Sequence, residues 1–395
     1  MTVRIARSLS DVDARQWNAL CAGAPPFLRH EFLLALEQSG CATPATGWDA
    51  HHLLLSDVRG DLIGAMPLYL KSHSWGEFVF DFAWAEAYRR AGLSYYPRLC
   101  AAVPFTPATG PRLLVLPADA ASTREALILA ARDLVQTLGV SSLHVLFPGE
   151  DDRHALEGAG LMARLDCQFH WHNAGYASFD DFVAGFTAEK RKKLKRERRR
   201  IADAGISHRT LHGDELDDAL IETVYSLHAR TFARFGNPPY LNLDFFQRLA
   251  RTMPRSLVVE LASLNDEIIA CAVALRSDDT LYGRYWGASG DHHSLHFETC
   301  FYRGIEYCIR EGLAHFEPGT QGEHKLLRGF VPEPVWSLHE IAQPRFAAAI
   351  RDWLKRERTL RLAYLRAAAD HLPFRRADIP ARLSVDVRDC LAAED

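Results

Sequence analysis

Glu298 is a carboxylate on the apolar face of a predicted helix, a position where ionisable side chains are uncommon. Residues 295–312 have helical spacing. At 100° per residue, four side chains fall within about 80° of one another: Glu298, Phe301, Ile305 and Ile309. A carboxylate among apolar groups has a raised pKa unless a cation pairs with it, and a raised pKa suits a general base near neutral pH. Two interpretations remain open for Glu298: a base, or a structural carboxylate that pairs with an arginine or caps the helix.

A second concentration of ionisable residues follows this helix. The segment FEPGTQGEHKLLRGF, residues 316–330, places Glu317, His324, Lys325 and Arg328 among three glycines. Loops at strand ends commonly carry catalytic groups, and glycines let the backbone approach a ligand closely. We expect Glu317 and His324 to be further candidates for the base, and Lys325 and Arg328 to bind phosphate. The alternative is a polar turn with ordinary salt bridges.

The segment 190–200 is strongly basic. It holds nine basic residues and one acid, although the formal charge of the whole chain is −4. One interpretation is that this segment is a helix face exposed to solvent. The functional interpretation is that Lys192, Lys193 and Lys195 bind a phosphate-rich ligand, such as the diphosphate of coenzyme A, a tRNA backbone or an anionic surface. No aromatic residue interrupts the run, so base stacking is not expected there.

Aromatic side chains are candidates for an acceptor pocket. Trp84 and Tyr88 lie in an aromatic-rich segment, and Tyr285 and Trp286 lie in the strand predicted before the helix of Glu298. Core packing is the alternative for these residues. The histidines and glutamates between 292 and 324 do not have the spacing of metal ligands, so no metal site is predicted.

The elements that must position these residues occur in a repeated order. With 395 residues, 48% hydrophobic and 24% charged, the chain has the composition of a globular protein of two or three domains. The order helix–helix–hairpin–strand–helix–strand occurs twice. It predicts an α/β (α+β) protein with domains at 1–172 and 173–343 and a helical extension at 344–395. Ser178 with Asp181 predicts the start of a long helix that continues to about residue 204.

The sequence predicts a cytoplasmic protein. Its longest apolar run, 268–275, is much shorter than the roughly 20 residues of a membrane-spanning helix. The first residues include charges and a helix cap, and no apolar stretch of signal-peptide type. None of the eight cysteines forms a C-x-x-C pair, as expected for reduced thiols.

Several stretches resemble the FemAB-like predicted N-acyltransferases, also called peptidoglycan biosynthesis/recognition proteins, of the GNAT superfamily. They are AWAEAYRRAGLSYYPRL (83–99), QFHWHNAGYASFDDFVAGFTAEKRKKLKRERR (168–199), YWGASGDHHSLHFETCFYRGIEYCIREGL (285–313) and FEPGTQGEHKLLRGFVP (316–332). The resemblance extends from about residue 27 to 370. It implies two tandem GNAT-like acyltransferase domains, in agreement with the repeated order of elements.

The resemblance also implies an activity, the transfer of an acyl or aminoacyl group from acyl-CoA or aminoacyl-tRNA to an amine. The donor would be a co-substrate, with no tightly bound cofactor. In GNAT folds it lies between two splayed strands, here 280–288 and 313–317, and backbone amides near Tyr285 hold the oxyanion. The signature Q/R-x-x-G-x-G/A corresponds to Arg284 and Gly287, followed by Ser289 in place of Gly or Ala. This departure leaves room for an aminoacyl-tRNA donor.

Two alternatives come from other functional classes. A non-catalytic recognition module could bind a cell-wall precursor or nucleic acid, and the altered signature favours it. The concentration of ionisable side chains at 317–328 favours an enzyme. A tRNA-binding protein without transfer activity is the third interpretation, and steep salt dependence would distinguish it.

Overall fold

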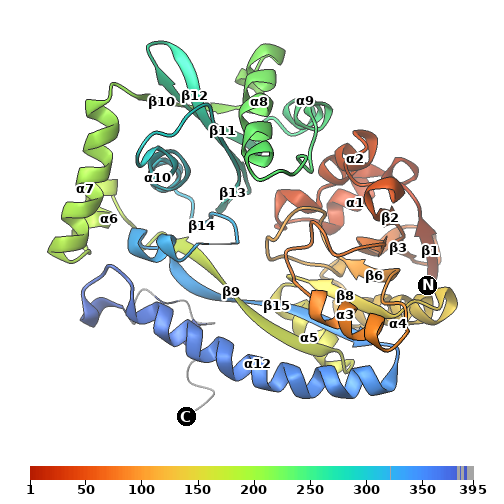
Figure 1. The fold of residues 1–395 in the computed structure, drawn as a ribbon. Coiled ribbons are helices and arrows are strands. Elements are labelled where there is room, and N and C mark those ends of the chain that lie inside the picture. Colours follow the sequence, from red (N-terminus) through yellow and green to blue (C-terminus); the bar gives the residue numbers. More distant parts are fainter. Residues whose placement is uncertain (321, 380–382, 384–386, 389–395) are drawn as a thin grey trace. The chain divides into compact units, whose positions relative to one another are not determined.

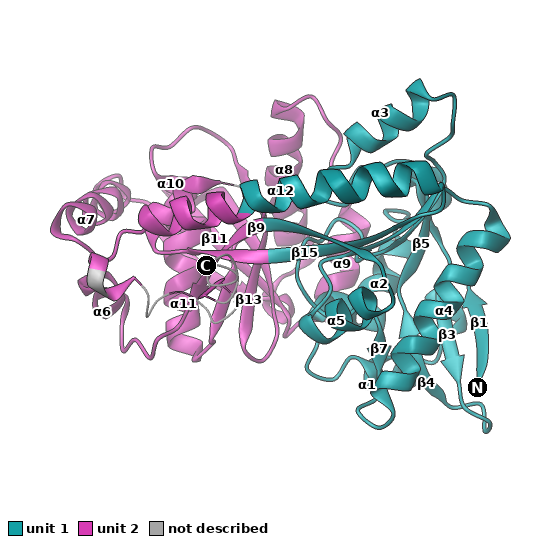
Figure 2. Cartoon of the chain, turned by 90° about the horizontal axis from the view of Figure 1, so that it is seen from below, with its two compact units in different colours: residues 1–166, 335–361 teal, residues 167–334, 362–395 magenta. Residues whose placement is uncertain are grey.

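The protein is described by a computed structural model that covers the chain except residues 321, 380–382, 384–386 and 389–395 (Figure 1). The described chain forms two compact units (Figure 2). The first comprises residues 1–166 and 335–361, and the second comprises residues 167–334 and the chain from 362. Three elements begin in one unit and end in the other: β9 (Met162–His172), β15 (Val331–Ile341) and α12 (Pro344–Asp370).

The units differ from the predicted domains near the C-terminal end. Residues 335–343, predicted to belong to the second domain, lie in the first unit because β15 pairs with β8 (Ser142–Leu146) in antiparallel register. The first part of α12, predicted to be a separate extension, buries Ile350 and Leu354 in the first unit. Residues 380–382, 384–386 and 389–395 of that predicted extension lie outside the described residues.

The first unit is built on two sheets. One has the strand order β1-β3-β4-β7 and the other the order β15-β8-β6-β5-β2. Apolar side chains of α4 pack with those of the strands in one buried cluster. The elements of this unit not yet given are β1 (Thr2–Ala6), α1 (Ala14–Leu20), α2 (His30–Gln38), β2 (Trp48–Ala50), β3 (His52–Ser56), β4 (Leu62–Met66), β5 (Leu68–Lys71), α3 (Phe82–Arg90), β6 (Arg98–Ala101), β7 (Leu114–Val115), α4 (Ala120–Leu138) and α5 (Glu150–Gly158).

The second unit is built on a sheet of order β10-β11-β12-β13-β14-β9, with helices on both faces (Figure 1). The turn between β11 and β12 uses Asn265 and Asp266 at positive φ, as the sequence predicts. Its elements are α6 (Phe179–Ala184), α7 (Ala188–Asp203), β10 (Ser207–His212), α8 (Asp218–Arg234), α9 (Leu243–Thr252), β11 (Leu257–Leu264), β12 (Glu267–Arg276), β13 (Thr280–Ala288), α10 (Leu295–Phe297), α11 (Arg303–Glu311), β14 (His315–Glu317) and the 3-10 helix η6 (Glu323–Arg328).

The long helix predicted from 178 to about 204 is two helices. Ser178 caps α6 as expected, because its side chain accepts a hydrogen bond from the Asp181 amide. The chain then leaves the helical path at 185–187. The Thr187 amide donates to the carbonyl of Pro373, and Thr187 takes an extended conformation that begins α7. Gly185 is the C-cap residue of α6, and the contact with Pro373 holds the extended residue that follows, so the break has both a local and a distant contribution.

The helix predicted at 295–312 is present, with an irregular turn inside it. Between α10 and α11 lies a π-helical turn, η5 (Glu298–Tyr302). Such turns occur frequently at functional sites, because they change the direction in which neighbouring side chains point. The residues of this turn and of the two flanking helices are described below as the 295–311 helix.

Helix α8 approaches β13 closely at a glycine. A Cβ atom on Gly287 would lie 2.2 Å from the backbone carbon and oxygen of Leu227 in α8. Real Cβ atoms do not make such contacts, so any side chain here must push the helix away from the sheet. Gly287, expected to contact a donor, therefore has a packing role in the structure.

We predict that Gly287→Ala lowers the free energy of unfolding by about 3 kcal/mol, because the new methyl group displaces α8. Gly290→Ala is the matched control. Its Cβ would meet only the His292 side chain, at 3.5 Å, and we expect a change within about 0.5 kcal/mol. Urea unfolding followed by circular dichroism measures both variants. Equal stabilities would show that the helix does not depend on this close approach.

Candidate active site

Strands β13 and β14 separate after a short parallel pairing and leave a cavity between them. The pairing joins three residue pairs and ends at Tyr282 and Glu317. Beyond this point a cavity of about 310 Å³ is lined by residues 283–286 of β13 and 318–320 after β14. The 295–311 helix and η6 supply further walls. All of these residues belong to the second unit.

A β-bulge in β13 lies at the cavity. Gly283 pairs with Ala274 and Tyr285 pairs with Val273, so Arg284 is the additional residue. Bulges commonly redirect side chains next to active sites. Arg284, Tyr285 and Trp286, all predicted site residues, line the cavity.

Lys325 is almost completely buried in the wall of this cavity. Its residue exposure is 2%, and its Nζ donates a hydrogen bond to the Gly319 carbonyl at 2.6 Å. Burial lowers the pKa of Lys325 to about 7, because the ammonium form loses hydration. The sequence assigned Lys325 to phosphate binding. The structure adds to that expectation its burial in the cavity wall and its lowered pKa.

Two histidines line the cavity with Lys325. The ring centroids of His296 and His324 lie 6.0 Å apart. Burial, together with neighbouring cations, lowers the pKa of each to about 4, so both rings are neutral near pH 7. Cys300 also lines this cavity. At helical spacing, His296 and Cys300 lie on the side of the helix opposite Glu298, and both line the cavity together with Phe301.

Another part of the cavity wall carries an ion pair that sequence reasoning missed. Arg303 Nε donates to Glu260 Oε1 at 3.0 Å, and Thr210 Oγ1 donates to Glu260 Oε2. All three residues line the cavity. Glu260 is a lone carboxylate in the apolar strand LVVELASL, the same signal that drew attention to Glu298.

Glu298 is buried as predicted, but it does not line the cavity. It is 5% exposed, and Arg198 of α7 donates to it through Nε and Nη2 at 2.9–3.2 Å. Burial raises the pKa of Glu298, and the charge of Arg198 opposes this rise. Arg198 Nη1 also donates to Glu306 at 2.7 Å. These contacts support the structural interpretation, a carboxylate paired with an arginine.

Arg328 of η6 likewise pairs with a carboxylate of α7 and helps to hold that helix in place. Its Nη2 donates to both carboxylate oxygens of Glu197 at 3.0–3.1 Å, and its guanidinium lies 3.4 Å from the ring centroid of Phe297. Tyr302 donates to Glu197 as well. Arg328 is buried and outside the cavity lining, so the structure gives it a packing role among apolar rings.

The remaining predicted residues lie elsewhere. Lys192, Lys193 and Lys195 are exposed on α7, where Lys195 forms a surface ion pair with Asp180 at 3.4 Å. Trp84 and Tyr88 are buried in the first unit, in a cluster that α12 covers. Glu317 ends the pairing of β14 and does not line the cavity.

Across the residues that the structure describes, no group of three or more His, Cys, Asp or Glu side chains is arranged to hold a metal ion. Over the same part of the chain, no helix has the length and apolar character needed to cross a bilayer.

Comparisons with known proteins identify relatives of this fold. The family model described as FemAB-like, peptidoglycan biosynthesis/recognition, matches residues 8–376. FemX is similar in structure, with a TM-score of 0.54 and 11% identity, over 89% of this chain and 100% of that one. No curated protein matches the sequence.

Two further solved structures are similar. One is the C-terminal domain of a putative lysylphosphatidylglycerol synthetase from Agrobacterium fabrum, with a TM-score of 0.52 and 10% identity over 88% of this chain and 97% of that one. The other is L-PGS from Bacillus licheniformis, with a TM-score of 0.53 and 9% identity over 84% and 93%. The predicted α/β fold class is confirmed, since each of the two units combines helices with a sheet.

We predict that Arg198→Met lowers the free energy of unfolding by roughly 2–3 kcal/mol, because the carboxylate of Glu298 stays buried without its cation. Adding Glu298→Gln should restore most of this loss. Arg310→Met, which breaks the exposed pair with Glu311, is the control and should cost less than about 1 kcal/mol. No recovery in the double variant would show that Arg198 acts independently of Glu298.

Proposed function

The chain belongs to the FemAB-like family of peptidoglycan biosynthesis/recognition proteins, and we propose that it is an N-acyltransferase whose donor site is the cavity between β13 and β14. The reaction moves an acyl or aminoacyl group from a thioester or an aminoacyl ester to an amine. The acceptor is a small molecule with a free amino group.

The observation that carries this proposal is the position of Lys325. A lysine at 2% exposure, with a pKa of about 7, lines an open cavity at the point where two parallel strands separate. A base with a pKa near the working pH is suited to remove a proton from an amine. Perturbed ionisable groups in a cavity are typical of catalytic sites.

The proposed chemistry has balanced proton transfers. Neutral Lys325 Nζ accepts a proton from the acceptor ammonium group. The amine nitrogen then forms a bond to the donor carbonyl carbon, and the carbonyl electron pair moves to oxygen. The tetrahedral intermediate loses its second nitrogen proton to solvent and expels the thiolate or alkoxide. Lys325 returns its proton to that leaving group, so one side chain serves as base and then as acid.

Other cavity residues support this step. The bulge at Arg284 breaks the regular β13 ladder beside the cavity, and the backbone amides near Tyr285 are the proposed oxyanion donors. His324 is a weaker candidate for the base, because its lowered pKa of about 4 reduces its affinity for a proton. Glu317 stays a candidate from its place at the end of the paired strands.

A second observation, the exposed cations of α7, supports one of the two donor types. Lys192, Lys193 and Lys195 lie on the helix whose Glu197 and Arg198 contact the 295–311 helix. A polyanionic donor with its reactive end in the cavity could extend its backbone along these lysines. We therefore favour aminoacyl-tRNA over acyl-CoA as the donor.

The first prediction concerns this donor. We expect aminoacylated tRNA to raise the melting temperature more than acetyl-CoA or a long-chain acyl-CoA, because a ligand that binds the native state stabilises it. Replacing Lys192, Lys193 and Lys195 by Gln should weaken tRNA binding and flatten its salt dependence. The control removes three exposed arginines of the same unit, Arg209, Arg234 and Arg251. A rise in melting temperature with acyl-CoA alone would identify the donor as a thioester. No rise with any donor would favour the non-catalytic recognition module.

The second prediction concerns Lys325. The unprotonated fraction falls below pH 7, so kcat/KM of the native enzyme should decline on the acid side with an apparent pKa near 7. Lys325→Met should lower kcat at least a hundredfold and remove this decline. His324→Gln should keep it, because the pKa of His324 is about 4. If His324→Gln removes the decline and Lys325→Met keeps it, the roles are reversed.

Stability gives an independent measurement on the same variant. The pKa of Lys325 is lower in the folded state than its ordinary 10.5, so the unfolded chain binds more protons between about pH 7 and 10.5. The native protein therefore gains stability as the pH rises through this window. Lys325→Met lacks this gain, and it should melt at a higher temperature than the native protein near pH 7, with the difference shrinking towards pH 9.5.

A further inference from the structure

The cavity extends beyond the gap between β13 and β14, beneath the 295–311 helix. Its lining includes a row of residues that pair directly across four neighbouring strands of the second unit: Thr210 of β10, Glu260 of β11, Ala272 of β12 and Trp286 of β13. Residues paired in one such row point to the same face of a sheet. Since neighbouring strands are about 4.8 Å apart, Glu260 lies about 10 Å across the sheet from β13.

Small apolar side chains cover the floor of the cavity between β13 and Glu260. Ala272 and Ala274 lie on β12, and Ala274 pairs with Val258 on one side and with Gly283 on the other. These four residues line the cavity. An extended aliphatic group therefore has room to lie along this floor, from the reacting position proposed at β13 towards Glu260.

The carboxylate of Glu260 has acceptor sites left for a ligand. Arg303 Nε donates to one of its oxygens at 3.0 Å, and Thr210 Oγ1 donates to the other. Among the residues that the structure describes, only these two side chains donate to Glu260, and a carboxylate has about four acceptor sites. About half of these sites are therefore available to a donor group that enters the cavity.

Glu260 also ends a chain of ion pairs that carries more negative than positive charge. Arg303 bridges Glu260 and Glu306, with Nη1 2.7 Å from Glu306. Arg198 in turn bridges Glu306 and Glu298. Three carboxylates thus share two guanidinium groups, and Glu260 is the carboxylate of this chain that lines the cavity. A cation bound there would balance the excess negative charge.

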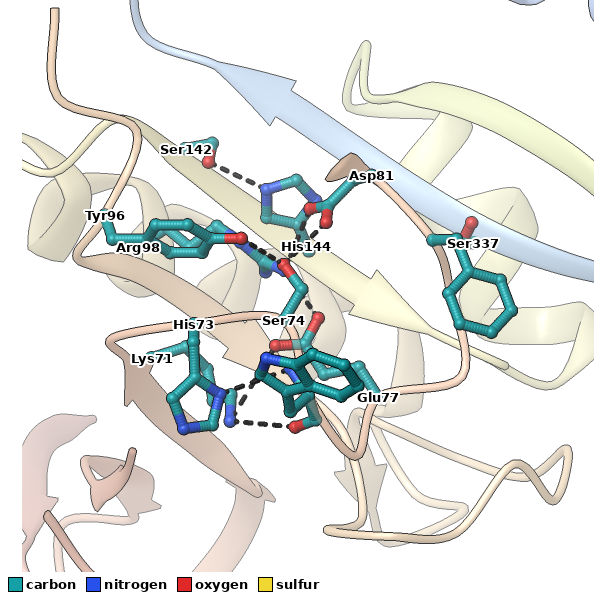
Figure 3. Close-up of polar contacts among 12 residues, drawn as sticks. Lys71, His73, Ser74, Glu77, Asp81, Tyr96, Arg98, Ser142, His144 and Ser337 are labelled. Carbon is teal, nitrogen blue, oxygen red and sulfur yellow. Dashed lines mark hydrogen bonds and ion pairs between the residues drawn. The ribbon is translucent and has the colours of Figure 1, made fainter. Parts of the chain in front are cut away.

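The buried charges of the first unit provide a comparison (Figure 3). Lys71 and Arg98 lie with Glu77 and Asp81, so that two cations meet two carboxylates. Those charges balance one another without a ligand. The chain of ion pairs in the second unit has a place for one more cation, and the cavity gives a substrate access to it.

The other cations near the cavity lie away from Glu260. Arg284 is on β13, two strands from Glu260, and Lys325 is on η6, which follows β14. Arg276 is the last residue of β12 and pairs with Glu311. The positive charge next to Glu260 is thus that of one arginine, which a second carboxylate shares.

We propose that the Glu260 end of the cavity binds a basic side chain, so that the transferred aminoacyl group is one that ends in an amine or guanidinium. The α-ammonium of an aminoacyl group is two bonds from the reacting carbonyl, so it stays near β13. A four-carbon side chain that ends in an ammonium, with one hydrogen bond, covers a distance of about 10 Å. This inference rests on the aminoacyl transfer proposed above and adds the class of the aminoacyl group.

The test compares one tRNA charged with lysine, norleucine or alanine, by filter binding to the full chain. Norleucine has the carbon side chain of lysine without the terminal ammonium. We expect lysyl-tRNA to bind at least about tenfold more tightly than norleucyl-tRNA, and Glu260→Gln to reduce this ratio to about two or less. Glu311→Gln is the control, because Glu311 lies on the helix of Arg303 but does not line the cavity. An unchanged preference in Glu260→Gln overturns the role of Glu260.

A second variant blocks the path to Glu260 and keeps its charge. Ala272→Leu fills the floor of the cavity next to Glu260. It should weaken the binding of lysyl-tRNA and norleucyl-tRNA at least about fivefold and affect alanyl-tRNA less, because a methyl side chain does not reach this floor. An equal effect on all three charged tRNAs would show that the side chain does not lie along β12.

A small probe separates this inference from the proposed donor. L-lysinamide at millimolar concentration should raise the melting temperature of the native chain and leave that of Glu260→Gln unchanged, whereas L-norleucinamide should raise neither. If lysinamide acts in this way and no charged tRNA binds, the basic site is retained and the tRNA donor is overturned. If the three charged tRNAs bind equally and lysinamide has no effect, the basic site is overturned and the tRNA donor is retained.

Discussion

The site depends on one constraint, that β13 and β14 pair over three residues and then part. Phe316 of β14 holds the strands where they are joined, since its ring packs where a Cβ of Gly304 would lie 2.5 Å away. The 295–311 helix can approach the sheet closely only because position 304 lacks a side chain. Above this contact the strands have space between them, and residues of β13, η6 and the helix face that space. The cavity is thus a consequence of strand pairing and of one glycine.

The basic helix α7 is divided into an internal and an external part. Glu197 and Arg198 point inwards, where Arg328, Tyr302 and Glu298 satisfy their charges and hydrogen bonds. The lysines of the same helix stay exposed. Removing either partner of a buried pair leaves the other charge buried and uncompensated. These pairs therefore bind α7 to the 295–311 helix electrostatically. The exposed cations therefore lie on a helix fixed to the wall of the cavity.

The sequence predicted helices and strands better than the distant residues with which their side chains interact. The strand at 280–288 agrees with β13, and the helix at 295–312 agrees with the observed 295–311 helix, because periodicity and turn residues define both. The same periodicity placed Glu298 inside. It could not reveal that Arg198, 100 residues earlier, pairs with Glu298, nor that the Pro373 carbonyl accepts a hydrogen bond from the Thr187 amide. Lys325 shows the same limit, since burial of a lysine is a property of tertiary structure.

Lys71 and Lys325, the two lysines buried among the described residues, differ in what surrounds them, and that difference supports the reactive role proposed for Lys325. Lys71 lies next to the Glu77 carboxylate, which partly offsets its loss of hydration, and the pKa of Lys71 is about 8. Lys325 forms no ion pair among the described residues, and its Nζ meets a backbone carbonyl. A carbonyl stabilises an ammonium less than a carboxylate does, so the proton of Lys325 is held more weakly. A proton held weakly beside an open cavity suits the proposed exchange with a substrate, whereas Lys71 Nζ contacts the Glu77 carboxylate and the Trp75 carbonyl.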